Sequence, residues 1–80
     1  VYYQRGDYRR AVEELERAHD LEVNDPTIAE HLGDAYRKTG DARRALDKYR
    51  RALDNSETDE QTERLRSKVD ELLGAHPELA

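Results

Sequence analysis

The 80-residue sequence has no cysteine, no long apolar run and no strongly basic segment. Without cysteine the chain forms no disulfide and offers no thiolate to a metal. A membrane-spanning helix needs about 20 consecutive apolar residues, so none is predicted here. The net charge is -5. Because basic residues are not concentrated anywhere, we expect no nucleic-acid partner and no membrane insertion by this segment.

The chain also lacks a secretory signal and an initiating methionine. It begins at Val1, which lies part-way through a unit of the repeat described below, so we expect it to be a fragment of a longer protein. The compartment stays unknown for the same reason. Arginine outnumbers lysine, which stands only at Lys38, Lys48 and Lys68. This bias indicates a GC-rich, bacterial genome.

One short sequence motif occurs twice, at positions 34 residues apart. The segment 6–12 reads GDYRRAV, and the segment 40–46 reads GDARRAL. A repeat of this length is typical of a helix pair stacked on copies of itself. Such stacks usually present a surface to a partner.

Apolar residues follow helical spacing along almost the whole chain, and no strand is predicted. The stripes predict a helical stub at 1–5 and helices near 8–22, 26–39, 42–54 and 59–73. Gly6 and Gly40 suit the left-handed position after a helix, and Asp7 and Asp41 can cap the next helix. Three further signals mark helix ends: Asp25-Pro26 as a start, Thr58 with Gln61 as a capping box, and Gly74 and Pro77 as a stop.

Residues 26–58 resemble a tetratricopeptide repeat. The matching positions are Leu32, Gly33, Tyr36, Ala45, Tyr49 and Ala52. Ala29 replaces the tryptophan of the family pattern, and Glu57 replaces its proline. Each matched residue has a packing role, with small residues where helices approach closely and tyrosines in the larger gaps.

The resemblance implies an all-α fold of antiparallel helix hairpins, stacked as a right-handed αα-superhelix. It implies one domain over 1–80, with the second half of a repeat at 1–25, a full repeat at 26–58, a capping helix at 59–74 and a tail at 75–80. The N-terminal flank, with Tyr2, Tyr3 and Tyr8, has no cap. We expect missing sequence or a second copy to cover it, which would make a homo-oligomer.

No catalytic, cofactor or metal constellation stands out, so an enzyme is not expected. His19, His31 and His76 lack the i, i+4 spacing of a ligand pair. Many carboxylates stand four residues from a cation, as Glu60 does from Arg64, and support their own helix. The basic run at 43–51 is interpreted as a solvated convex face interrupted by Asp47, with a phosphate-binding patch as the less favoured interpretation.

In this family the first helix of each pair usually lines the concave groove. By register, the partner-binding residues here are Thr27, Glu30, His31, Asp34, Arg37, Lys38, Arg64 and Lys68. Glu30 and Asp34 disfavour the clamp that some family members close on a C-terminal carboxylate. The prediction is therefore a non-enzymatic scaffold that binds a polar peptide or helix of a partner protein. The alternative is self-association as one segment of a longer solenoid.

Overall fold

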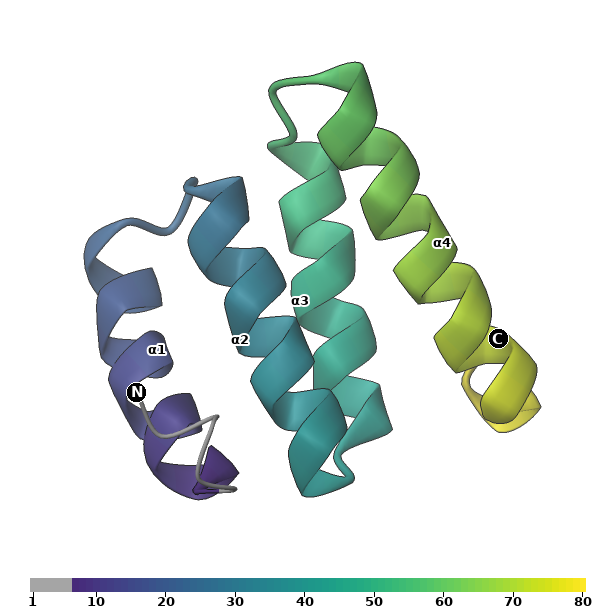
Figure 1. Cartoon of the computed structure of the whole chain (residues 1–80), viewed down its shortest axis with the longest axis horizontal. Helices are drawn as coiled ribbons and strands as arrows, with labels where there is room; N and C mark the ends of the chain where they lie inside the picture. Colours follow the sequence, from purple (N-terminus) through teal and green to yellow (C-terminus); the bar gives the residue numbers. More distant parts are fainter. Residues whose placement is uncertain (1–6) are drawn as a thin grey trace.

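A computed structural model describes residues 7–80 and consists of four α-helices and one short 3-10 helix. The elements are α1 (Tyr8–Leu21), α2 (Pro26–Thr39), α3 (Ala42–Asp54), α4 (Asp59–Ala75) and η2 (Pro77–Leu79). The four helices lie side by side in sequence order (Figure 1). The prediction of an all-α fold is confirmed, and within residues 7–80 there is no strand. The predicted stub at 1–5, with Tyr2 and Tyr3, lies outside the described residues.

The predicted Gly-Asp junction between the paired helices is confirmed at residues 40–41. Gly40 has a φ of 88°, the left-handed conformation that ends α2 with little strain. Asp41 then caps α3, because its Oδ1 accepts a hydrogen bond from the Arg44 amide at 3.1 Å. Asp7 caps α1 in the same way, accepting from the Arg10 amide at 3.3 Å. The repeated Gly-Asp motif therefore places the same aspartate cap at the start of α1 and of α3.

The other two helix starts are also fixed by side chains. Asp25 accepts from the Thr27 amide at 2.9 Å, with Pro26 at the first helical position. Thr58 caps α4 by accepting from the Gln61 amide at 3.1 Å. The Gln61 side-chain oxygen accepts in turn from the Glu57 amide, one residue before the cap. Of the stop predicted at Gly74 and Pro77, the Gly74 part is wrong, because α4 runs through Gly74, and the Pro77 part is confirmed, because the helix ends at Ala75 before that proline.

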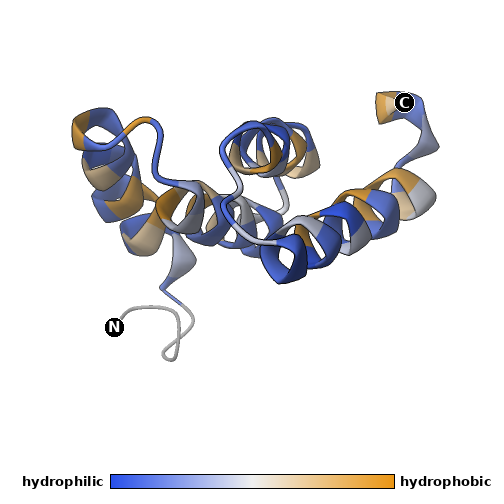
Figure 2. Ribbon diagram, turned by 90° about the horizontal axis from the view of Figure 1, so that it is seen from above, coloured by the Kyte–Doolittle hydropathy of each residue, from blue (hydrophilic) through white to orange (hydrophobic). Residues whose placement is uncertain are grey.

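The core forms where α3 lies over the space between α2 and α4 (Figure 2). Leu32 of α2, Tyr49 of α3 and Leu65 of α4 are its largest fully buried side chains. The buried Tyr49 hydroxyl donates to Asp34, so its polar atom is satisfied. Burial and this carboxylate together raise the pKa of Tyr49. Tyr49 therefore stays neutral and links the core to the outer face of α2.

Tyr36 joins the preceding half repeat to this core. Its side chain is 7% exposed, and its hydroxyl donates to Glu16 of α1. Burial and the hydrogen bond to Glu16 raise the pKa of Tyr36 to about 12. Lys48 of α3 approaches the same carboxylate at 3.7 Å. Glu16 thus connects α1 to both helices of the full repeat.

His19 is a buried polar group on α1. It is 4% exposed, and its Nε2 has no hydrogen-bond partner among the described residues. Desolvation, reinforced by Lys48 and Arg51, lowers its pKa against the opposing effect of Glu16 and Asp20. The imidazole is therefore held neutral in the fold. Because its pKa is lowered on folding, stability declines as pH falls below the ordinary value of 6.5.

Gly33 lets the helices of the full repeat approach closely. A Cβ placed on Gly33 would lie 2.6 Å from Cε1 of Tyr49, a distance that real contacts do not reach. Its φ is not in the left-handed region, so the requirement is for space alone. The prediction that small residues mark close helix approach is confirmed here.

Substituting Gly33 tests this packing. We expect Gly33→Ala to lower the free energy of unfolding by roughly 1–3 kcal/mol, because the ring of Tyr49 has to move. Gly74→Ala is the matched control, since nothing lies within 4 Å of a Cβ there. That helical position should gain up to about 1 kcal/mol. Urea unfolding of both variants measures this, and equal effects would contradict the packing assignment.

Candidate functional site

The predicted partner-binding residues lie along α2 and α4, and the structure divides them into two groups. Thr27, His31, Arg37 and Lys38 are exposed on α2. Glu30, Asp34, Arg64 and Lys68 instead contact one another across the two helices. We call this second group the α2–α4 ion network.

Glu30 is the centre of the network. It is 4% exposed, and Arg64 donates two hydrogen bonds to it, Nε to Oε2 at 2.7 Å and Nη2 to Oε1 at 2.9 Å. The Lys68 ammonium donates to the same carboxylate at 2.8 Å. The Arg64 hydrogen bonds, helped by Lys68, lower the pKa of Glu30 to about 2 against the opposing effect of burial. At neutral pH the Glu30 carboxylate is therefore ionised, and both of its oxygens accept hydrogen bonds from α4.

Lys68 extends the network to a second carboxylate. Its Nζ lies 3.0 and 3.1 Å from the two carboxylate oxygens of Asp34. The same Nζ lies 5.7 Å from the centre of the Tyr49 ring, within the range of a cation–π contact. Since Asp34 also accepts from the Tyr49 hydroxyl, one lysine connects α4 to both helices of the repeat.

Three ion pairs between α2 and α4 share one spacing in sequence. They are Glu30–Arg64, Asp34–Lys68 and Arg37–Glu71, and each joins residues 34 positions apart. The spacing equals the sequence repeat, so α4 stands beside α2 as the first helix of a following repeat would. At each of the three equivalent positions the charge changes sign from α2 to α4.

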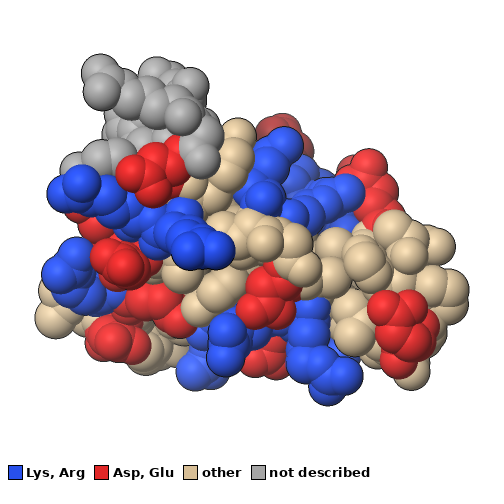
Figure 3. All heavy atoms as spheres, turned by 90° about the horizontal axis from the view of Figure 1, so that it is seen from below, with Lys and Arg blue, Asp and Glu red and all other residues tan. Residues whose placement is uncertain are grey.

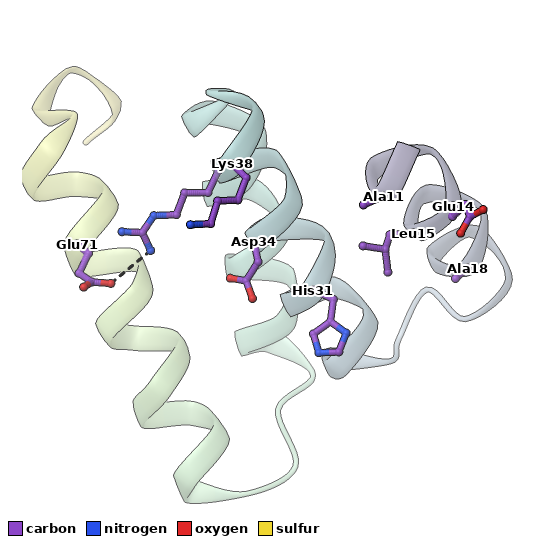
Figure 4. A pocket seen from close by; sticks show the side chains of 9 residues that line it. Ala11, Glu14, Leu15, Ala18, His31, Asp34, Lys38 and Glu71 are labelled. Carbon is purple, nitrogen blue, oxygen red and sulfur yellow. Dashed lines mark hydrogen bonds and ion pairs between the residues drawn. The ribbon is translucent and has the colours of Figure 1, made fainter. Parts of the chain in front are cut away.

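Of the exposed residues of α2, His31, Arg37 and Lys38 line an open groove, shown in Figure 4, whereas Thr27 is not part of its lining. Its volume is about 1150 Å³. It is lined by Ala11, Glu14, Leu15 and Ala18 of α1, by His31, Asp34, Arg37 and Lys38 of α2, and by Glu71 of α4. We call it the α1–α2 groove. One wall is largely aliphatic and the floor is polar, a combination that suits an amphipathic ligand.

The charged side chains that line this groove form weaker and more exposed ion pairs than those of the α2–α4 ion network. Arg37 and Glu71 pair at 3.3 Å, but both side chains are exposed, at 38% and 62%. Such an exposed pair is worth on the order of 0–1 kcal/mol and yields readily to a competing group. Glu14 on α1 and Lys38 on α2 form no ion pair with any residue of the 7–80 segment. Glu14 and Lys38 therefore give the groove one acidic and one basic side chain that form no ion pair within the described residues, in addition to the exposed Arg37–Glu71 pair.

The spacing of the ion pairs, the Gly40 hairpin and the close approach at Gly33 all belong to one repeat architecture. A family model described as the tetratricopeptide repeat matches residues 1–60. The chain belongs to the tetratricopeptide repeat family. A search of functionally curated proteins gave no match. Tetratricopeptide repeats are generally non-enzymatic modules for protein interaction, and this chain has the helical hairpin of that family.

Other kinds of site find little support among the described residues of this repeat protein. No three of their histidine, aspartate or glutamate side chains are grouped to hold a metal ion. No helix among them is long and apolar enough to cross a bilayer. Figure 3 shows basic and acidic side chains interspersed on one face of the molecule. That face has no broad field of one sign of the kind that nucleic-acid binding requires.

The sequence predicts the floor of the groove but not its wall. Leu15 and Ala18 stand 34 residues before the core positions Tyr49 and Ala52, yet they are only half-buried and line the groove. The pairing of Glu30 with Arg64 is also absent from the sequence prediction, which pairs Arg64 with Glu60 of its own helix. Opposite charges one repeat apart are the sequence signal that would reveal this pairing.

The low pKa of Glu30 predicts a specific loss of stability in acid. A carboxyl whose pKa falls from 4.5 to about 2 on folding contributes its full stability above pH 4.5 and loses it as pH falls toward 2. Glu30→Gln should therefore cost on the order of 2–3 kcal/mol at pH 7 and flatten the decline below pH 5.

Urea unfolding at several pH values between 2.5 and 7 measures this. Glu71→Gln is the control, because its exposed pair should contribute less than about 1 kcal/mol. A Glu30→Gln variant whose stability declines in parallel with the unmodified chain between pH 5 and 2.5 would rule out Glu30 as the source.

Proposed function

We propose that this repeat segment is a non-enzymatic interaction module that holds a peptide or helix of a partner protein in the α1–α2 groove. The observation that supports this most is that the half-buried Leu15 and Ala18 of α1 and the polar face of α2 line the same groove. The volume of this groove is about 1150 Å³. An apolar wall beside a charged floor binds one side of an amphipathic segment and leaves its other side in water.

The site that we propose is narrower than the one predicted from sequence. The α2–α4 ion network already holds these two helices together. Substituting its residues would therefore disrupt the fold of the site together with any contact to a ligand. His31 and Lys38 are exposed on the groove floor. They, with Leu15 and Ala18 on the wall, are the residues on which we expect a ligand to depend.

Self-association is the second candidate. The observation that favours it is the same α1 stripe, with Tyr8 half-buried at the start of that helix. A second copy could cover this flank. Sedimentation velocity from about 1 to 100 µM separates the two, because self-association predicts a mass that rises with concentration, whereas a groove for a foreign ligand predicts a constant mass.

Mapping a bound peptide on the protein tests the proposal. Peptides selected from a display library against the 80-residue chain would be titrated into ¹⁵N-labelled protein. We expect the largest amide shifts at Leu15, Ala18, His31 and Lys38, and little change on the outer face of α3.

Two matched charge reversals refine this test. Lys38→Glu lies on the groove floor, and Arg43→Glu lies on the exposed face of α3. Lys38→Glu should change the affinity of the selected peptides several-fold, and Arg43→Glu by less than about twofold. Shifts centred on α3, or equal effects of the two variants, would contradict the proposed groove.

A further inference from the structure

His19 is a titratable residue at a position where the following repeat has an apolar one. It stands 34 residues before Leu53, which is half-buried and packs against the core. The imidazole is as buried as a core residue, at 4% exposed. Its Nε2 is the one buried side-chain nitrogen or oxygen of residues 7–80 that has no hydrogen-bond partner. A positive charge on this ring would therefore be buried without an acceptor at Nε2, which is unfavourable.

The charged groups nearest to His19 on α1 and α3 do not compensate for this burial. Burial, Lys48 and Arg51 lower the pKa of His19 against the opposing effects of Glu16 and Asp20. Both cations belong to α3, and both carboxylates belong to α1 itself. Protonation would therefore add a third positive charge where α1 faces α3.

Helices α2 and α4 offer no better counter-charge. Residues 22–25 join the end of α1 to the start of α2, and the first turn of α2, Pro26–Ala29, has no charged side chain. The carboxylate of Asp25 already accepts hydrogen bonds from two amides of that turn. Helix α4 lies at the opposite end of the row of helices from α1 (Figure 1). The neutral ring is thus the form that this junction accommodates.

The same junction depends on a small number of polar contacts. Glu16, three residues before His19, accepts a hydrogen bond from Tyr36 of α2 and lies 3.7 Å from Lys48 of α3. The buried core cluster contains residues of α2, α3 and α4 but none of α1. Separation of α1 from its neighbours therefore breaks the contacts of Glu16 and leaves the centre of the core closed.

The α2–α4 ion network responds to acid in a different pH range. Because the pKa of Glu30 is about 2 in the fold, this carboxylate stays ionised in mild acid, and its stabilising effect declines only below the ordinary value of 4.5. His19 has the opposite sign of response: its lowered pKa makes the docking of α1 independent of pH above 6.5 and weaker as pH falls below that value. Mild acid therefore acts on α1 before it acts on α4.

We propose that His19 is a proton-sensitive switch for the docking of α1. Protonation of the ring in mild acid releases α1 from α2 and α3, while α2, α3 and α4 stay packed. The released helix carries Leu15 and Ala18 away from α2, so the α1–α2 groove loses its wall. The switch needs no ligand, and only its consequence for ligand binding rests on the proposed function.

Hydrogen exchange of backbone amides tests the switch in the absence of any ligand. The 80-residue chain is measured at about pH 7 and about pH 5.5, on either side of the ordinary histidine pKa, and rates are corrected for the intrinsic effect of pH. In mild acid the amides of α1 should exchange through an opening that depends little on added urea, whereas those of α4 should need the urea-sensitive unfolding of the whole chain. The opening of α1 should be at least about threefold more populated at the lower pH.

Three variants assign this response to one residue. His19→Leu introduces the residue that stands at the equivalent position 53, and His19→Asn is a second neutral variant that keeps a polar group. In both, the opening of α1 should be equally populated at the two pH values. His76→Gln is the matched control, because that side chain is 42% exposed and lies beyond α4. It should keep the pH response of the unmodified chain.

The ring resonances of His19 report its protonation directly, and their titration should have a midpoint below 6.5. A midpoint at or above that value would overturn the inference. So would a single urea-sensitive opening shared by α1 and α4 in mild acid, or a pH response of α1 that both His19 variants retain. Because no ligand is present, each of these results leaves the proposed function to be decided by its own experiments.

Discussion

The contact between Glu30 and the two cations of α4 is the interaction on which the rest of the structure depends. Helix α4 carries Leu65 and Leu72 to the core, and its polar contacts with α2 add a directional requirement that apolar burial lacks. The two hydrogen bonds from Arg64 to Glu30 and the bridge of Lys68 to Asp34 exist in one register only. A buried carboxylate left without these partners would cost several kcal/mol, so the network ties the docking of α4 to that register.

This constraint also decides which surface can act on a partner. A row of charged residues on the first helix of a repeat is typical, in sequence, of a binding face. In the folded chain Glu30 and Asp34 contact α4, whereas the exposed charges of α2 line the groove. Lys38 and the exposed pair of Arg37 are among them. The same helix thus uses one set of charges to complete the fold and leaves another at the groove.

Helix positions and core residues are predictable because each depends on local or repeating signals. The bounds of α2 and α3 follow from Asp25, Pro26, Gly40 and Asp41, and the 34-residue register places Tyr49 and Leu32 in the core. The ion network is harder, because Arg64 has the carboxylate of Glu60 within its own helix as an alternative partner. Only the packing distance of α4 from α2 decides between intrahelical and interhelical pairs. The half-exposed wall at Leu15 is hidden by the repeat pattern itself, which gives the same residue types to covered and uncovered faces.

A double-mutant cycle on Glu30 and Lys68 tests the central claim most directly. The free energies of unfolding of Glu30→Gln, Lys68→Gln and the double variant would be measured at pH 7 in low salt. If the network fixes α4 in its register, the sum of the two single losses should exceed the loss of the double variant by about 1–3 kcal/mol. Losses that add to within roughly 0.5 kcal/mol would show that α4 is held by its apolar face alone, and would contradict a central role for the ion network.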